Sequence, residues 1–208
     1  MPLQRFFFAR PCLDVARDLL GMYLSHDGVV LRITEVEAYV GPHDTACHAA
    51  KGRTPRNEAM YGPPGTAYVY TCYGIHQLLN LVTDREGHPA AVLIRACEPV
   101  EALDVVRARR GGKRGPVLLT GPGKVGAALA LDPSWCGHDL CAPGGLTVEP
   151  AEPAADVVVG ARVGVDYAEP GDRDAPYRLA VAGTRWVSHR GRLSAPQAPR
   201  QLPTDGEP

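Results

Sequence analysis

The sequence predicts an α+β fold, a single domain in which helices flank a curved, largely antiparallel sheet. The chain has 208 residues, of which 45% are hydrophobic and 22% charged, and this is enough to bury one sizeable core. Strand-like segments precede the helical ones, without the strand–helix–strand alternation that builds parallel sheets. A His26-Asp27-Gly28 turn between two strand-like segments is typical of an antiparallel hairpin.

The first third of the chain combines a short helix, a hairpin and a long loop. Apolar residues at helical spacing predict a helix over 12–20, which Gly21 ends. Strands over 22–25 and 29–40 form the hairpin. The following segment, 41–65, is rich in glycine, proline, asparagine and charge. Because compact domains rarely keep such a long loop without a use for it, we expect this loop to carry function.

The remainder of the chain is expected to add strands to the sheet and helices beside it. Strands are predicted from runs of β-branched and aromatic residues bounded by turn residues, and helices from apolar residues three and four apart. The expected strands are 66–72, 77–82 and 90–96, with a Tyr73-Gly74 turn joining the first two, and shorter ones near 146–148, 157–165, 177–181 and 186–187; the expected helices are 100–109 and 123–131.

The ends of the chain show no sign of membrane insertion or export. No stretch of eighteen apolar residues occurs, and residues 1–10 lack the apolar centre of a signal peptide, so we expect a soluble protein in the cytoplasm that does not bind membranes. A single domain is predicted over 1–192. The proline-rich segment 193–208 is predicted to be a disordered tail.

Cysteine usage and charge restrict the function classes. Six scattered cysteines suit reduced, buried thiols better than a disulfide framework. The CGHDLC segment, with Cys136, His138 and Cys141, lacks the spacing of a paired zinc site, so no metal is predicted. The net charge of −1 argues against nucleic-acid binding, but the segment 105–131 contains six basic residues and no acidic one. Such a run is either a solvated face or a phosphate-binding surface. Its basic residues are Arg107, Arg109, Arg110, Lys113, Arg114 and Lys124.

Two carboxylates on one predicted strand are the first candidates for chemistry. In the strand 29–39, Glu35 and Glu37 fall on the same face as the apolar Ile33, and Tyr39 falls beside Glu37. A carboxyl group among apolar and aromatic neighbours loses hydration, which raises its pKa and makes it a candidate general base or acid. The alternative is a strand whose acidic face simply meets water.

Four segments of the chain resemble the alkyladenine DNA glycosylase family, also called 3-methyladenine or methylpurine DNA glycosylases. They cover most of the chain outside the tail, and ordered matches of this length are far more specific than a lone glycine motif. The segments are ITEVEAYVGPHDTACHAAKGRTPRNEAMYGPPGTAYVYTCYGIHQLLNLV from Ile33 to Val82, VLIRACEPVEAL from Val92 to Leu103, LLTGPGKVGAALALD from Leu118 to Asp132, and ARVGVDYAEP from Ala161 to Pro170.

The resemblance implies a monomeric enzyme, without metal or cofactor, that excises damaged purines from double-stranded DNA. A base inside a duplex cannot present its sugar carbon to an enzyme, so the nucleotide must rotate into a pocket. By similarity, Tyr73 is the residue that intercalates into the minor groove. The base would stack between Tyr39 on one side and His48 with Tyr70 on the other, at about 1–3 kcal/mol per stacked base.

The resemblance also implies the roles of three polar residues. Asn80 matches the residue that crowds the 2-amino group of guanine and so disfavours this undamaged base. Glu37 would take a proton from a water molecule that attacks C1′ and leaves an abasic site. Arg95 would hold this glutamate, the water and the 3′ phosphate in line. With water as nucleophile, the enzyme is expected to be monofunctional and not to cut the strand.

Several alternatives stay open on sequence alone. Glu35 is either a supporting or a surface residue. Gly123 and Lys124 begin a predicted helix and either hold a DNA phosphate or serve close packing. Lesions beyond alkylated purines, such as deaminated or etheno purines, are also expected substrates. The competing functions are a non-catalytic protein that binds damaged DNA and a hydrolase of small nucleosides or glycosides.

Overall fold

The long strand β2 (Val29–Tyr39) is the centre of the sheet. In the computed structural model, which describes residues 1–195, β5 (Ala90–Glu101) pairs with one edge of β2. The other edge of β2 pairs first with β1 (Tyr23–His26) and then with β8 (Arg178–Val181). Every strand pairing within these residues is antiparallel, which confirms the predicted α+β class.

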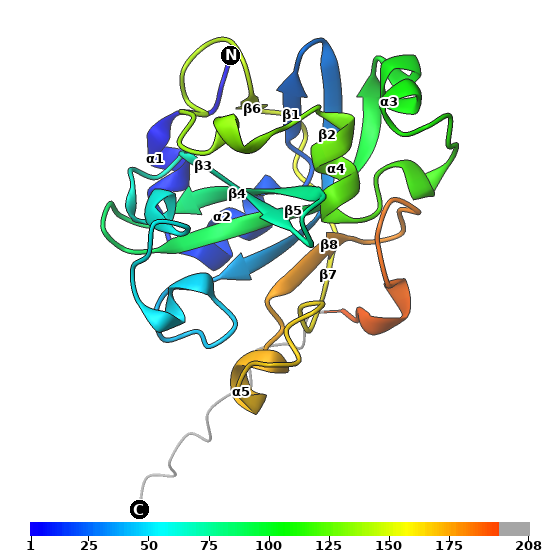
Figure 1. The fold of residues 1–208 in the computed structure, drawn as a ribbon. Helices are drawn as coiled ribbons and strands as arrows, with labels where there is room; N and C mark the ends of the chain where they lie inside the picture. The colour runs from blue at the N-terminus through cyan, green and yellow to red at the C-terminus, as the bar shows by residue number, and fades with distance from the viewer. Residues whose placement is uncertain (196–208) are drawn as a thin grey trace, which may run out of the picture.

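The other strands extend this centre in both directions (Figure 1). β4 (His76–Thr83) pairs with β5, and β3 (Ala67–Cys72) forms the edge beside it. On the opposite side β1 pairs with β6 (Thr147–Glu149), while β7 (Val157–Gly160) pairs with β8. The strand order from one edge is therefore β3-β4-β5-β2-β1-β6, with β8 and β7 joined to the second half of β2.

Helices cover both sides of the sheet. The helix α2 (Cys12–Leu19) packs behind the strands and α4 (Pro122–Ala128) packs in front of them, next to α3 (Leu103–Arg109) (Figure 1). Two short helices, α1 (Arg5–Phe8) and α5 (Pro170–Arg173), were not predicted from the sequence. The main core includes Leu19 of α2, Ile33 and Val36 of β2, and Val125 of α4. None of the helices among residues 1–195 has the length and hydropathy needed to span a bilayer.

Glycines with positive φ occur where the sequence predicts the end of the first long helix and the turn of the first hairpin. α2 ends at Leu19, and Gly21, the predicted stop, follows two residues later with φ of +98°. Asp27 and Gly28 both have positive φ, 48° and 74°, which is the backbone of a type I′ hairpin turn between β1 and β2.

Several sequence predictions about secondary structure were wrong. The expected helix over 100–109 begins only at Leu103, because β5 continues through Glu101 and Ala102 adopts a left-handed conformation with φ of 53°. The expected strand 157–165 ends at Gly160. Residues 186–187 form no strand; instead the carbonyl oxygen of Trp186 accepts a 2.6 Å hydrogen bond from the hydroxyl of Thr34.

The C-terminal boundary predicted at 192 stays a prediction. Ser194 forms an antiparallel bridge with Val159, so the chain contacts the domain at least to this residue. The remainder of the predicted tail, 196–208, lies outside the described residues.

We predict that Gly126→Ala lowers the free energy of unfolding by about 1–3 kcal/mol. A methyl group at Gly126 of α4 would overlap the carbonyl oxygen of Gln77, which is backbone and cannot rotate away. Urea denaturation checks this, with Gly171→Ala in α5 as the matched control, since a methyl group there meets no atom within 4 Å. Equal unfolding midpoints for both variants would contradict the packing argument.

Candidate active site

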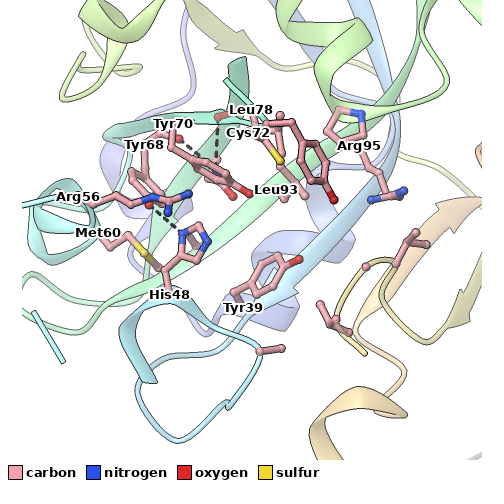
Figure 2. A pocket seen from close by; sticks show the side chains of 18 of the residues that line it. Tyr39, His48, Arg56, Met60, Tyr68, Tyr70, Cys72, Leu78, Leu93 and Arg95 are labelled. Atoms are coloured by element: carbon pink, nitrogen blue, oxygen red, sulfur yellow. Dashed lines mark hydrogen bonds between the residues drawn. The ribbon is translucent and has the colours of Figure 1, made fainter. Parts of the chain in front are cut away.

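A cavity of about 360 Å³ opens on the face of the sheet formed by β3, β4 and β5. The loop 41–65 forms a second wall and the segment 163–167 a third. The volume is within the range of small-molecule sites. Figure 2 shows the aromatic, arginine and sulfur-containing side chains that converge on it. The cavity is lined by Tyr39, Ala46, His48, Arg56, Met60, Tyr68, Tyr70, Cys72, Tyr73, Leu78, Asn80, Ala91, Leu93, Arg95, Pro122, Val163, Gly164, Val165 and Tyr167.

The floor of the pocket follows from strand alternation. Tyr68 and Tyr70 are two apart on β3 and therefore point to the same face, with ring centroids 5.4 Å apart. Asn80 of β4 is opposite Tyr68, and its side-chain amide donates a 3.0 Å hydrogen bond to the carbonyl oxygen of Tyr68. Both predicted pocket residues on these strands, Tyr70 and Asn80, thus line the cavity.

His48 reaches the pocket from the functional loop predicted over 41–65. It begins the 3₁₀ helix η1 (His48–Lys51), and its Nδ1 is 2.9 Å from the hydroxyl oxygen of Tyr68. Its ring packs edge-on against Tyr70, with centroids 4.7 Å apart. Burial, and then the positive charge of Arg56, lower the pKa of His48, so the imidazole is neutral at pH 7.

Tyr39 connects the pocket to the buried carboxylate of Glu37. The ring of Tyr39 lines the cavity, and its hydroxyl donates a 3.1 Å hydrogen bond to Oε2 of Glu37. Burial and the adjacent Glu37 raise the pKa of Tyr39 well above its usual value, so the phenol keeps its proton and stays a donor. The prediction that Tyr39 falls beside Glu37 is confirmed.

Glu37 lies directly behind the wall of the pocket rather than on its surface. Its side chain is 0% exposed, but three residues that contact it line the cavity. The backbone N–H of Val163 donates to Oε1 at 2.8 Å, and Nη1 of Arg95 is 3.3 Å from the same oxygen. Burial raises the pKa of Glu37, although Arg95 and this N–H oppose the rise.

Arg95 bridges the two carboxylates of β2. Its Nε is 3.2 Å from Oε1 of Glu35 while its Nη1 reaches Glu37, so both acids lie on the same side of the sheet. Nε also donates to the hydroxyl of Ser188 at 3.2 Å. The register of β2 against β5 is irregular on both sides of Glu35, and such bulges commonly occur beside active sites, where they re-aim side chains.

Glu35 is a buried anchor, not a surface residue. One of its oxygens accepts from the N–H of Ser188 at 2.7 Å, and the other from the Ser188 hydroxyl at 2.9 Å. Arg178 of β8 adds an ion pair at 3.1 Å, and both its side chain and that of Glu35 are 0% exposed. These contacts with Ser188, Arg178 and Arg95 hold Glu35 in place, and Glu35 is not among the residues that line the cavity.

A buried ion pair behind Tyr39 joins the loop 41–65 to the C-terminal part of the chain. Nη1 and Nη2 of Arg162 each donate to the carboxylate of Asp44, and the bond from Nη2 is 2.7 Å long. The side chains of Arg162 and Asp44 are 0% exposed. The Arg162 guanidinium stacks 4.8 Å from the centroid of Tyr39 and 5.2 Å from that of Tyr177. Arg162 therefore fixes the ring that forms one wall of the pocket.

Tyr73 stands at the tip of the β3–β4 hairpin, where the sequence predicts a turn. It is 91% exposed and also lines the mouth of the cavity. Tyr73 and Gly74 have φ of 51° and 72°, and the N–H of Ile75 donates to the carbonyl oxygen of Cys72, which is a type I′ turn. This backbone projects the ring away from the sheet.

Gly123 and Lys124 are engaged in packing within the domain. A methyl group at Gly123 would lie 2.8 Å from the ring of His76, so the glycine allows α4 to approach β4. The ammonium group of Lys124 donates to the carbonyl oxygen of Thr120 at 2.9 Å. Pro122 is the residue of α4 that lines the cavity, and the phosphate-binding role of its two neighbours stays a prediction.

Sequence reasoning missed several residues of the site. Arg56, Tyr68 and the backbone of Val163 belong to the pocket or to its carboxylate, and Arg162, Arg178 and Ser188 support it. Two signals in the sequence could have indicated some of them. Tyr68 is two residues before Tyr70 on the same strand, and Arg162 and Val163 lie in the ARVGVDYAEP segment. The cysteines and histidine of CGHDLC form no metal cluster with other residues in the described part of the chain.

Comparisons with known proteins identify the family. A family model described as methylpurine-DNA glycosylase matches residues 6–185. A putative 3-methyladenine DNA glycosylase of Nitrosococcus oceani is 60% identical over 195 residues, which cover 94% of this chain and 95% of the relative. The DNA-3-methyladenine glycosylase of Arabidopsis thaliana is 53% identical, with 88% of this chain and 72% of the relative covered.

A third relative, the putative 3-methyladenine DNA glycosylase of Methanocella arvoryzae, is 45% identical. The matched residues cover 90% of this chain and 96% of the relative. The match of the family model includes β2, which carries both glutamates, the loop 41–65 and the tip of the β3–β4 hairpin. The chain therefore belongs to the methylpurine-DNA glycosylase family and is a DNA glycosylase.

Proposed function

We propose that this enzyme rotates a damaged purine nucleotide out of double-stranded DNA and hydrolyses its N-glycosidic bond, leaving an abasic site. One observation carries the proposal: the aromatic pocket and the buried carboxylate of Glu37 share a wall, formed by Tyr39, Arg95 and Val163. A base held in the pocket would thus have its sugar next to a general base. The enzyme acts as a cytoplasmic monomer, through the domain 1–192.

The everted base stacks on aromatic rings while Tyr73 fills the gap in the duplex. Unstacking a base costs a few kcal/mol, which a side chain inserted between base pairs offsets. Tyr39 forms one wall of the stack, and His48 with Tyr70 forms the other. Asn80, fixed by its hydrogen bond to the carbonyl of Tyr68, crowds the 2-amino group of guanine. The substrates are alkylated purines, extending to deaminated and etheno purines.

Glu37 accepts a proton from the attacking water through Oε2. The other oxygen, Oε1, is already held by Val163 and Arg95, whereas Oε2 accepts one hydrogen bond, from Tyr39, and has capacity for a second. Water attacks C1′ as the purine departs, and the carboxylate also stabilises the positive charge that develops on the sugar. Arg95, which lines the cavity, orients Glu37 toward the water and meets the 3′ phosphate.

We predict that Glu37→Gln lowers base release from alkylated duplex DNA by about 10²–10⁴-fold, because an amide cannot take a proton from water. Glu35→Gln, the matched control on the same strand, retains release at a reduced rate, since Glu35 only orients Arg95. The measurement is single-turnover release of free base, with circular dichroism to verify folding. Loss of activity in Glu35→Gln alone would reverse the assignment of the general base.

The same assay separates the competing functions. Free base and an intact strand with an abasic site are expected, and a nick with a borohydride-trapped adduct would contradict the monofunctional mechanism. Binding without release would indicate a damaged-DNA binding protein, and release from nucleoside alone a small-molecule hydrolase.

We predict that Tyr73→Asn lowers release from duplex DNA by about 10- to 100-fold and has much less effect on single strands, where no stack has to be filled. Asparagine tolerates positive φ better than most residues, so the turn is preserved while the ring is lost. Rates on the two substrates are compared for each protein. Equal losses on duplex and single-stranded DNA would exclude a wedge.

We predict that the rate of base release rises with pH, because Glu37 must be ionised to act as a base. Since burial raises the pKa of Glu37, the rise occurs above the ordinary glutamate pKa of about 4.3. The hydroxyl of Tyr39 lowers this pKa through its hydrogen bond. Tyr39→Phe therefore moves the rising part of the pH–rate profile to higher pH. Tyr167→Phe, whose hydroxyl binds the carbonyl of Ala46 instead, leaves it in place; an equal shift in both variants would contradict this role of Tyr39.

A further inference from the structure

Arg56 is an arginine of the pocket that has no role in the proposed attack of water on C1′. It lies on the loop 41–65, between η1 and the 3₁₀ helix η2 (Glu58–Tyr61). The buried side chain of its neighbour Asn57 fastens this part of the loop by donating to the carbonyl oxygens of His48 and Gly52, at 3.1 and 2.9 Å. The backbone at Arg56 is therefore held in place, while its own side chain lines the cavity.

The guanidinium of Arg56 lies among the aromatic walls of the pocket. Its carbon Cζ is 5.3 Å from the centroid of the Tyr70 ring. Figure 2 shows the side chain beside Tyr68, Tyr70 and His48, on the side of the pocket away from Arg95. After burial, the charge of Arg56 is the second cause that lowers the pKa of His48, so this charge acts inside the site.

No carboxylate neutralises Arg56 within residues 1–195. Its loop neighbour Arg53 forms a close ion pair with Glu58, but no acidic side chain of the described chain lies within 4 Å of the Arg56 guanidinium. Among the described residues that line the cavity there are two arginines and neither aspartate nor glutamate. Arg95 is paired with Glu35 and Glu37 behind the wall. Arg56 is therefore the arginine of the wall whose charge no described carboxylate neutralises, and its guanidinium offers N–H donors.

Departing purines differ in charge, and this difference decides whether the positive charge of Arg56 can stabilise them. When the C1′–N9 bond breaks, its electron pair goes to the purine. A cationic alkylpurine such as 7-methylguanine leaves as a neutral molecule, whereas a neutral purine such as hypoxanthine leaves as an anion. Donors fixed near a developing negative charge lower the barrier. A fixed cation gives no such help to a leaving group that arrives positive and departs neutral.

We propose that Arg56 is a specificity-determining residue that extends the activity to neutral purine lesions, by donating hydrogen bonds to the departing purine anion. The water oxygen bonds to C1′, one water proton passes to Glu37, and the purine anion afterwards takes a proton from solvent. Arg56 keeps its own proton throughout, as expected for a guanidinium. This inference rests on the proposed function, because it concerns the same pocket and the same bond.

The test compares Arg56→Gln with the unaltered enzyme on two duplexes that differ only in the damaged base. One duplex contains hypoxanthine and the other 7-methylguanine, and single-turnover release is measured at saturating enzyme. We expect hypoxanthine release to fall at least about tenfold, while 7-methylguanine release stays within about twofold or rises. Arg53→Gln is the matched control, since both arginines are exposed residues of the same loop but only Arg56 lines the cavity.

Each outcome bears on the proposal. A fall in the ratio of the two rates for Arg56→Gln, with no change for Arg53→Gln, supports it. An equal loss on both duplexes overturns it, because a residue that only supports the loop or binds DNA backbone would slow both reactions alike. If the unaltered enzyme releases neither base, the proposed function itself fails.

Discussion

The site depends on the burial of two carboxylates on the central strand of the sheet. Glu35 and Glu37 are 0% exposed, and an unpaired buried carboxylate costs several kcal/mol. Since β2 lies between β5 and β8, each neighbour can supply an arginine: Arg95 from one side and Arg178 from the other. The acids are therefore fixed in position before any substrate binds. Such preorganised charge is what electrostatic catalysis requires.

The two acids differ in their partners, and this difference supports the roles proposed for them. Glu35 is surrounded by Ser188, Arg178 and Arg95, so it orients other groups. Glu37 is bound on one oxygen by Val163 and Arg95 and only lightly on the other. Arg162, held by its ion pair with Asp44, stacks on the ring of Tyr39, whose hydroxyl donates to Glu37. Residues 118 positions apart in the chain thereby set the distance between the aromatic walls and the carboxylate.

Sequence reasoning succeeded where the information is local. Alternation on one strand was enough to place Glu37 beside Tyr39, and the Tyr73-Gly74 turn followed from residue type. It could not find Arg162, because nothing near this residue indicates that its partner is Asp44. The false strand at 186–187 has a similar cause: its β-like residues serve instead to bring the Trp186 carbonyl to Thr34. Arg56 was missed because an arginine in a polar loop has no signature of its own.

Two tight hairpin turns, β1–β2 and β3–β4, offer an internal comparison. Asp27-Gly28 and Tyr73-Gly74 have similar φ angles, 48° and 74° in the first turn and 51° and 72° in the second. The connections differ in length, since His26 pairs with Val29 whereas Cys72 pairs with His76. Aspartate adopts positive φ readily, whereas a bulky residue seldom does. A tyrosine in this conformation, with its ring 91% exposed, stabilises neither the turn nor the core. Strain of this kind often occurs at functional positions, and among the described residues Tyr73 combines it with an exposed aromatic ring at the mouth of the cavity. The backbone of this hairpin therefore supports the proposed role of Tyr73 as a wedge.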